Sequence, residues 1–186
     1  QCCLVGSEMC IRDRNKLFNI IGFQASWWGC VLGVQAGMTY LGPFLMFSFL
    51  AVHIIRILDN YSELKLIILF GFIGTVIDTG MAYFGILIYN GTYFPDTYIA
   101  PLWITSMWCG FSATVNHSLS WLHNRYVASA ALGVISGPLS YLAGVKFGAI
   151  EFDATPIIAL IIISIYYGIT IPLIYWVNEK IVVNTN

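Results

Sequence analysis

Groups that can bind a ligand or carry a proton are concentrated in an otherwise apolar stretch of the chain, MWCGFSATVNHSLSWLH. This stretch contains Asn116, His117, Ser120 and His123. A histidine can exchange a proton near neutral pH or bind a metal ion. A polar group in hydrocarbon must be compensated by a hydrogen bond or a charge partner. These side chains therefore indicate either a functional site or hydrogen bonds between helices.

Polar residues elsewhere in the chain are expected at two different depths. Counting along the predicted helices places Asn19 and His53 at the same cytoplasmic depth as Asn116. We therefore predict one inner polar site formed by Asn19, His53, Asn116, His117, Ser120 and His123. Asp78 lies about 21 Å along the third predicted helix, at about 1.5 Å per residue, and belongs to a separate outer site. A buried carboxylate needs a partner, and we expect Lys146 to supply it, directly or through water.

The spacing of these residues disfavours two kinds of chemistry. His117 and His123 are six residues apart, or about 120° apart on a helix, whereas one helix chelates a metal through residues three or four apart. We expect no cysteine and no second acidic residue at their depth, and so no metal site. The segment GFSAT lacks the closing glycine of the G-x-S-x-G motif of serine hydrolases. No catalytic residue is assigned, and no cofactor is expected.

Membrane helices must position these groups. The chain has 186 residues, of which 59% are hydrophobic and 9% charged, and its mean hydropathy is +0.80. Soluble domains carry about 25% charged residues, and the net charge of −1 argues against a nucleic-acid partner. We predict an all-α, polytopic membrane protein, a compact bundle of six transmembrane helices at about 17–37, 42–58, 64–88, 99–123, 128–148 and 156–177.

Basic residues set the expected orientation of the six spans. The face that would hold both termini carries most of them, and the opposite face carries only Lys146. The positive-inside rule therefore places both termini in the cytoplasm, N-in and C-in. The residues on the cytoplasmic face are Lys16, Arg56, Lys65, Arg125 and Lys180.

Side-chain size and polarity also predict how the helices face one another. Glycines recur at helical spacing in the first, third and fifth spans, which favours close approach of helix backbones. On a helical wheel of the fourth span, Asn116, Ser120 and His123 share one stripe, and Val115 and Leu119 lie opposite. We therefore predict one continuous two-faced helix that runs to His123.

The first fourteen residues, QCCLVGSEMCIRDR, resemble a translated sequencing-linker artefact and not the start of a membrane domain. We expect residues 1–14 to be a non-native leader and residues 15–186 to form a single six-helix transmembrane domain. Three of the five cysteines fall in the leader. The other two, Cys30 and Cys109, are expected to be buried thiols and not a disulfide.

Several long strings resemble one bacterial membrane-protein family. They are NIIGFQASWWGCVLGVQAGMTYLGP, GTVIDTG, PLWITSMWCGFSATVNHSLSWL and GPLSYLAGVKFGAIEF. The family is domain of unknown function 2878, and the resemblance covers about residues 19–176. It implies a bacterial inner-membrane protein and transfers no catalytic residue. Genes of that family often neighbour cyclopropane-fatty-acid-type methyltransferase genes, which implies a role in lipid metabolism or envelope maintenance.

The leading functional hypothesis is a membrane protein that binds or modifies a lipid-derived substrate in an intramembrane polar pocket. Its expected partners are membrane lipid and a lipid-derived small molecule. One alternative is a small proton-coupled transporter. Another is a non-catalytic membrane partner of a soluble lipid-modifying enzyme. A pocket that opens sideways to lipid would favour the leading hypothesis.

Overall fold

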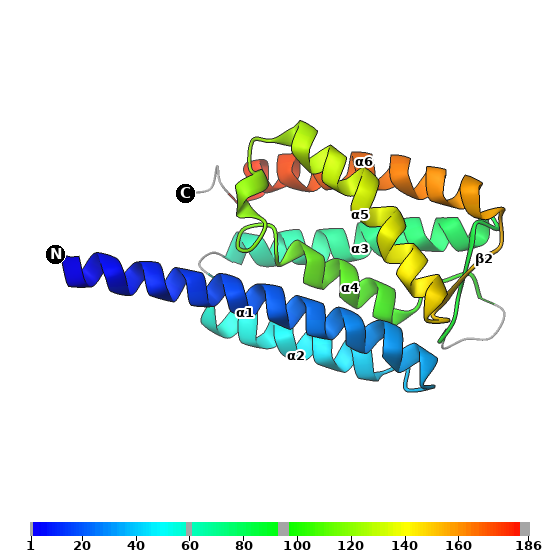
Figure 1. Cartoon of the computed structure of the whole chain (residues 1–186), viewed down its shortest axis with the longest axis horizontal. Helices are drawn as coiled ribbons and strands as arrows, with labels where there is room; N and C mark the ends of the chain where they lie inside the picture. The colour runs from blue at the N-terminus through cyan, green and yellow to red at the C-terminus, as the bar shows by residue number, and fades with distance from the viewer. Residues whose placement is uncertain (1, 59–60, 93–96, 183–186) are drawn as a thin grey trace.

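The computed structural model describes residues 2–58, 61–92 and 97–182, with side chains from residue 13 onward. This described part contains six α-helices and two short strands, which confirms the prediction of a helical bundle (Figure 1). The elements are α1 (Cys2–Gln35), α2 (Leu41–Arg56), α3 (Tyr61–Tyr83), β1 (Leu87–Tyr89), α4 (Leu102–Ser112), α5 (Tyr126–Lys146), β2 (Ile150–Phe152) and α6 (Pro156–Ile181).

Four segments of the described chain are long and apolar enough to cross a membrane. They are Asp13–Gln35, Tyr61–Tyr83, Tyr126–Lys146 and Pro156–Ile181. Helix α2 is apolar but has only 16 residues, and α4 has only 11. A helix rises about 1.5 Å per residue and the hydrocarbon core is about 30 Å thick. The helices found at the second and fourth predicted spans, α2 and α4, are therefore too short for a full crossing.

The helices pack as three neighbouring pairs, α1 with α2, α3 with α4, and α5 with α6 (Figure 1). Helix α4 also contacts α1 and α2, and α6 also contacts α3. Helix α1 begins and α6 finishes at the same end of the bundle, which we call the terminal end (Figure 1). The opposite end, where β1 and β2 lie, is called the ribbon end. The last turn of α2 lies beside the first turn of α3 at the terminal end, where His53 contacts Glu63.

Two short strands at the ribbon end were not predicted. Helix α3 stops at Tyr83 and not at residue 88, because Gly85 adopts a left-handed φ of 66° and the Ile86 N–H donates to the Met81 carbonyl. Helix α5 stops at Lys146 in the same way, because Gly148 has a φ of 72° and the Ala149 N–H donates to the Gly144 carbonyl. The chain leaves each helix as a strand, and β1 and β2 then pair antiparallel.

Glycine allows the closest contacts between helices. A Cβ added to Gly42 in α2 would lie 2.2 Å from the Cys30 Cα in α1. One added to Gly133 in α5 would lie 2.4 Å from the Tyr167 carbonyl oxygen in α6. Real Cβ atoms do not approach other atoms so closely. The predicted close approach of helix backbones is thus confirmed at Gly133 in the fifth span, whereas Gly71 and Gly74 in the third span face side chains of Cys109 and Trp108.

The predicted fourth span is not one continuous helix. Helix α4 ends at Ser112. Residues 113–123, called here the interrupted segment, form tight turns and a short 3-10 helix at Ser120–Leu122. The hydroxyls of Ser112 and Thr114 donate to carbonyls one turn earlier, at Trp108 and Phe111, and such bonds compete with a regular helix. The wheel prediction of one two-faced helix to His123 is therefore wrong beyond Ser112.

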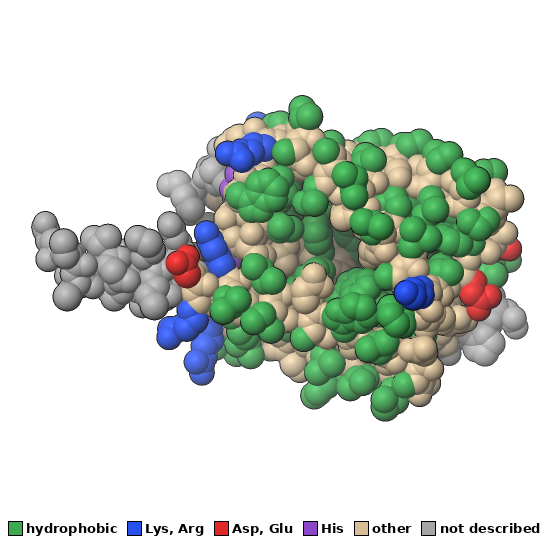
Figure 2. Space-filling model, in the orientation of Figure 1, with side chains coloured by type: hydrophobic (Ala, Val, Ile, Leu, Met, Phe, Trp, Pro, Cys, Tyr) green, Lys and Arg blue, Asp and Glu red, His purple; other side chains and the backbone are tan. Residues whose placement is uncertain are grey.

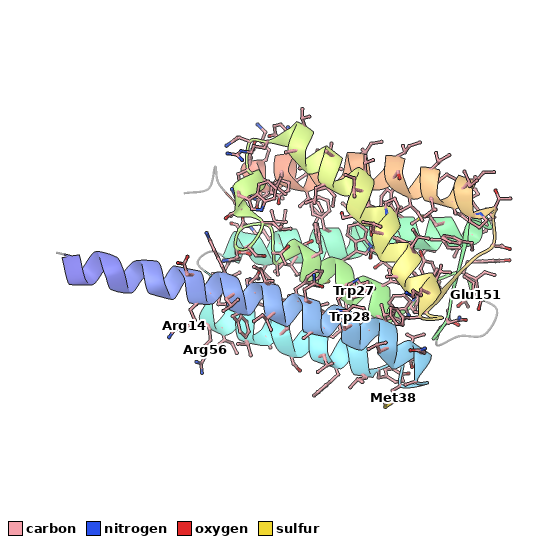
Figure 3. The ribbon with its side chains drawn as sticks, in the orientation of Figure 1. Arg14, Trp27, Trp28, Met38, Arg56 and Glu151 are labelled. Carbon is pink, nitrogen blue, oxygen red and sulfur yellow. The ribbon has the colours of Figure 1, made fainter. Side chains whose placement is uncertain are left out.

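Apolar side chains cover the visible face of the bundle, and charged side chains gather toward its ends (Figure 2). Arg14 and Arg56 lie at the terminal end, and Glu151 lies at the ribbon end (Figure 3). Large side chains such as Phe72 and Ile165 are 67% and 58% exposed along the middle of α3 and α6. A water-soluble protein rarely exposes so continuous an apolar surface. This distribution is compatible with a membrane protein.

Candidate functional site

The predicted inner polar residues all meet at the interrupted segment, but they form three separate groups and not one cluster. Each group joins the segment to a different helix or pair of helices. The groups contain Asn19 from α1, Asn178 from α6, and His53 and Glu63 from α2 and α3. Non-helical backbone inside a membrane domain is tolerated when protein groups satisfy its hydrogen bonds.

Asn19 is fully buried and joins α1 to the interrupted segment through two hydrogen bonds. Its Nδ2 donates to the Ala113 carbonyl at 3.0 Å. Its Oδ1 accepts a hydrogen bond from the Ser118 hydroxyl at 2.6 Å. Asn19 thus satisfies a carbonyl that the end of α4 leaves without a helical partner.

Asn178 of α6 binds the interrupted segment from the opposite side. The amides of Asn116 and Asn178 donate to each other, at 3.0 and 2.7 Å. The Asn178 Nδ2 also lies 3.4 Å from the Nε2 of His123. One helical turn earlier, the Tyr175 hydroxyl donates to the Leu119 carbonyl at 3.0 Å. Sequence reasoning missed Asn178 and Tyr175, because Asn178 lies just beyond the predicted sixth span and Tyr175 has the character of an interface aromatic residue.

His123 lies at the edge of this group and is partly buried. Burial lowers the pKa of His123 below its ordinary value, and the nearby charge of Glu179 acts in the opposite direction. Its imidazole packs edge-on against the Tyr175 ring at a centroid distance of 5.5 Å. The lowered pKa favours the neutral form of the His123 imidazole. Ser120 makes a local contact, in which its hydroxyl donates to the His117 carbonyl at 2.9 Å.

The third group joins two histidines to one carboxylate. Glu63 in the first turn of α3 lies 3.1 Å from the His117 Nε2 and 3.4 Å from the His53 Nε2. The two imidazole rings meet edge-on, with centroids 4.8 Å apart. Glu63 was not predicted, because it precedes the apolar run that marked the third span. The expectation of no second acidic residue at this depth is wrong.

Asp78 forms the predicted outer site with partners other than the expected one. It is fully buried in α3. Its Oδ1 accepts hydrogen bonds from Tyr141 and, at 2.5 Å, from Tyr89. Its Oδ2 accepts a bond from the Trp108 indole at 2.7 Å. Lys146 is exposed at the end of α5, and no ion pair joins it to Asp78 in the described part of the chain.

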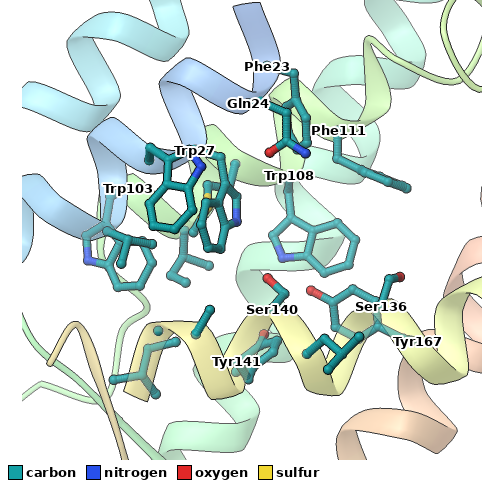
Figure 4. A pocket seen from close by; sticks show the side chains of 18 of the residues that line it. Phe23, Gln24, Trp27, Trp103, Trp108, Phe111, Ser136, Ser140, Tyr141 and Tyr167 are labelled. Carbon is teal, nitrogen blue, oxygen red and sulfur yellow. The ribbon is translucent and has the colours of Figure 1, made fainter. Parts of the chain in front are cut away.

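A cavity of about 580 Å³ lies next to the Asp78 site. Residues of α1, α4, α5 and α6 line it, and Trp108 and Tyr141 belong both to its wall and to the partners of Asp78 (Figure 4). The aromatic rings of Trp27, Trp108 and Tyr167 face it, and the Ser140 hydroxyl points toward it (Figure 4). None of the lining residues is Asp, Glu, Lys, Arg or His.

The mouth of this cavity lies on the side of the bundle, where the space-filling view shows a hollow ringed by apolar side chains (Figure 2). Gln24 and Trp28 of α1 and Ser136 and Leu139 of α5 line the cavity and are exposed. All four lie near the middle of segments long enough to cross a membrane. In a bilayer, the mouth would therefore face hydrocarbon and not either aqueous side.

Comparison with known proteins identifies a family but no activity. No curated protein and no solved structure matches the chain. Residues 16–173 match the family described as "Protein of unknown function (DUF2878)". That match covers most of the 186 residues and agrees with the resemblance seen in the sequence. The chain belongs to the DUF2878 family.

Proposed function

We propose that this protein is a bacterial inner-membrane protein, with both termini cytoplasmic, that binds an uncharged lipid-derived ligand in its lateral cavity. The observation that carries the proposal is the cavity itself, about 580 Å³ in volume and lined without a charged side chain. Ligand sites commonly measure about 300–1,000 Å³ and combine an apolar wall with a few polar groups. Here Ser136, Ser140 and Gln24 supply those groups.

The chemistry of the wall selects the ligand class. An anionic head group would need a cation to balance its charge, and the lining contains no Lys, Arg or His. Six tryptophan and tyrosine rings beside the cavity suit an apolar chain or ring system instead, namely Trp27, Trp28, Trp103, Trp108, Tyr141 and Tyr167. A hydroxyl or carbonyl on the ligand could exchange a hydrogen bond with Ser140. We therefore expect a lipid alcohol, ester or ketone and not a free fatty acid or a phospholipid.

The position of the mouth supports entry from the bilayer. Gln24 and Ser136 lie near the middle of the segments Asp13–Gln35 and Tyr126–Lys146, on opposite sides of the cavity (Figure 4). A lipid-derived molecule could enter there without crossing an aqueous phase. Entry from water would require a mouth at one end of the bundle. The lateral mouth favours lipid binding over solute transport and over a role limited to partner binding.

Photo-crosslinking in detergent micelles tests the proposal. A diazirine-bearing fatty alcohol should label the cavity-lining parts of α1 and α5, and the matching fatty acid should label them at least tenfold less. The Ser140→Trp variant fills the cavity and should lose this labelling. Ile165→Trp is the matched control, since Ile165 is 58% exposed on α6 and does not line the cavity.

Two outcomes would contradict lipid binding in the cavity. One is labelling spread evenly over the exposed apolar faces of all helices. The other is labelling that is the same in the Ser140→Trp and Ile165→Trp variants. A stronger signal from the fatty acid than from the fatty alcohol would reject the uncharged ligand class.

A further inference from the structure

We propose that His53, Glu63 and His117 form a binding site for a divalent transition-metal ion such as Zn²⁺, separate from the lateral cavity. Three different elements supply these residues, namely α2, α3 and the interrupted segment. The site lies at the terminal end of the bundle and includes none of the residues that line the cavity. A spacing argument along one helix could not find it, because each ligand comes from a separate part of the chain.

The donor set is one that metals use. Two imidazoles and one carboxylate bind zinc in catalytic sites that keep a fourth position open, and also bind non-haem iron(II). One donor atom of each residue can be chosen so that all three lie within 4.8 Å of one another. No other group of three or more His, Cys, Asp and Glu side chains in the described residues meets that condition.

The distances suit tetrahedral coordination. Zinc binds nitrogen and oxygen at about 2.1 Å, so two ligands at a tetrahedral angle lie about 3.4 Å apart. The His53 Nε2 lies 3.4 Å from the Glu63 Oε1. The His117 Nε2 lies 3.1 and 3.2 Å from the two Glu63 oxygens. Both imidazoles therefore already point their Nε2 atoms at the carboxylate, and a small rotation of the rings would admit an ion between the three groups.

The charge of Glu63 also requires a positive partner. Its side chain is 4% exposed, and no Lys or Arg forms an ion pair with it in the described chain. A buried carboxylate is stabilised either by a proton on one of the histidines or by a bound cation. A divalent ion would balance this charge while both imidazoles stay neutral, which is the form that binds metals.

The two ring nitrogens of His53 differ, because the Nε2 faces Glu63 and the Nδ1 does not. His53 is fully buried, and its Nδ1 has no hydrogen-bond partner among the described residues. An ion bound at the His53 Nε2 would place the ring proton on this Nδ1, so the site also needs a water beside the Nδ1 as an outer-shell partner. The side chain of His117 is 13% exposed, so an ion or a water ligand could enter from its side.

Metal titration of the purified full-length chain tests the site. After treatment with a chelator, the protein in detergent should bind about one Zn²⁺ per chain in isothermal titration calorimetry. Co²⁺ should give the strong visible d–d bands of a tetrahedral site. The Glu63→Gln and His117→Ala variants should weaken binding of either ion by at least about 100-fold, since loss even of an outer-shell partner costs about 10–100-fold.

A matched variant controls for surface binding. His123→Ala removes a histidine of the same interrupted segment that contacts Asn178 and not Glu63, and it should bind Zn²⁺ like the original chain. Far-ultraviolet circular dichroism checks that each variant keeps its helices, and Glu63→Gln preserves the shape of the side chain if His117→Ala unfolds. Absence of stoichiometric binding, or equal affinity in Glu63→Gln and His123→Ala, overturns the proposal.

Discussion

Asp78 shows how a carboxylate can be held inside an apolar bundle without a basic partner. Its two oxygens accept three hydrogen bonds from the hydroxyls of Tyr89 and Tyr141 and from the indole of Trp108. Each donor comes from a different element, namely β1, α4 and α5. The carboxylate therefore joins the ribbon to two helices and fixes two aromatic rings that form the wall of the lateral cavity.

Replacement of Asp78 by asparagine should destabilise the protein. The asparagine amide has one acceptor oxygen and one NH₂ group, so at least one of the three donors would lose its acceptor. We expect Asp78→Asn to lower the free energy of unfolding by about 1–3 kcal/mol, as for a buried group left unsatisfied. Denaturant titration in micelles measures this loss.

A second aspartate provides the control for this substitution. Asp153→Asn changes an exposed residue and should stay within about 0.5 kcal/mol of the original chain. Asp78→Asn should also cost less in a Trp108→Phe background, because the indole donor is then absent. Equal stability of the Asp78→Asn and Asp153→Asn variants would show that these hydrogen bonds do not hold the bundle together.

His123 should make the stability of the protein depend on pH. Burial lowers its pKa in the folded state, so the unfolded chain binds the proton more tightly. The contribution of His123 to the free energy of unfolding is complete above its pKa in the unfolded chain, about 6.5, and is lost as the pH falls through its lower pKa in the folded state. When the pH is lowered from about 8 to about 5.5, the original chain should therefore lose more free energy of unfolding than the His123→Gln variant. Unfolding free energies measured at both values check this, and a constant difference would contradict it.

At the scale of elements, apolar runs in the sequence predicted where the helices lie. The ends of the helices depend instead on individual turn residues. The predicted second span, 42–58, corresponds closely to α2 at Leu41–Arg56, and the sixth to α6. The end of α3 depends on Gly85, whose φ of 66° stops the helix before the predicted boundary. Periodicity of apolar residues continues past such a glycine, so hydropathy alone places the end too late.

The interrupted segment could not be predicted from its own residues. It contains no proline and no glycine, and its apolar and polar residues alternate with helical spacing. Its non-helical path is stabilised by Asn19, Asn178 and Tyr175, which lie far away in sequence. Its polar residues do hydrogen-bond to protein groups, but Val115, which was expected on the opposite face, is fully buried, and the partners depend on the arrangement of the other helices. Glu63 was missed for another reason, because it precedes the apolar run that marked the third span.

Two glycine substitutions should have opposite effects on helix packing. Gly42→Ala would bring a Cβ to 2.2 Å from the Cys30 Cα, so α1 and α2 must separate, at an expected cost of about 1–3 kcal/mol. Gly80→Ala in α3 meets no atom within 4 Å and should stabilise the helix by about 0.5–1 kcal/mol. Thermal or denaturant unfolding in micelles compares the two variants. A stabilising Gly42→Ala would show that α1 and α2 do not approach so closely.

For the whole molecule, the distribution of charge and apolar surface suggests how the protein lies in a membrane. Exposed apolar side chains occupy the middle of the helices, and Arg56, Lys65, Arg125 and Lys180 are exposed toward the terminal end. Among these basic residues and Lys146, only Lys146 lies toward the ribbon end. Basic residues are retained on the cytoplasmic side of membrane proteins. The terminal end is therefore expected in the cytoplasm, together with the His53–Glu63–His117 site, and the ribbon end is expected outside.

Cysteine labelling in intact cells tests this orientation. In a background in which the five cysteines of the chain are replaced, single cysteines are introduced by Asp153→Cys at the ribbon end and by Tyr61→Cys at the terminal end, where Tyr61 is 81% exposed. A membrane-impermeant maleimide should label the Asp153→Cys variant in intact cells and the Tyr61→Cys variant only after permeabilisation. The Phe72→Cys variant, at a residue 67% exposed in the middle of α3, should be labelled poorly in both cases, because lipid excludes the reagent. The reverse pattern would place the terminal end outside, and rapid labelling of the Phe72→Cys variant would show that the apolar surface does not lie in lipid.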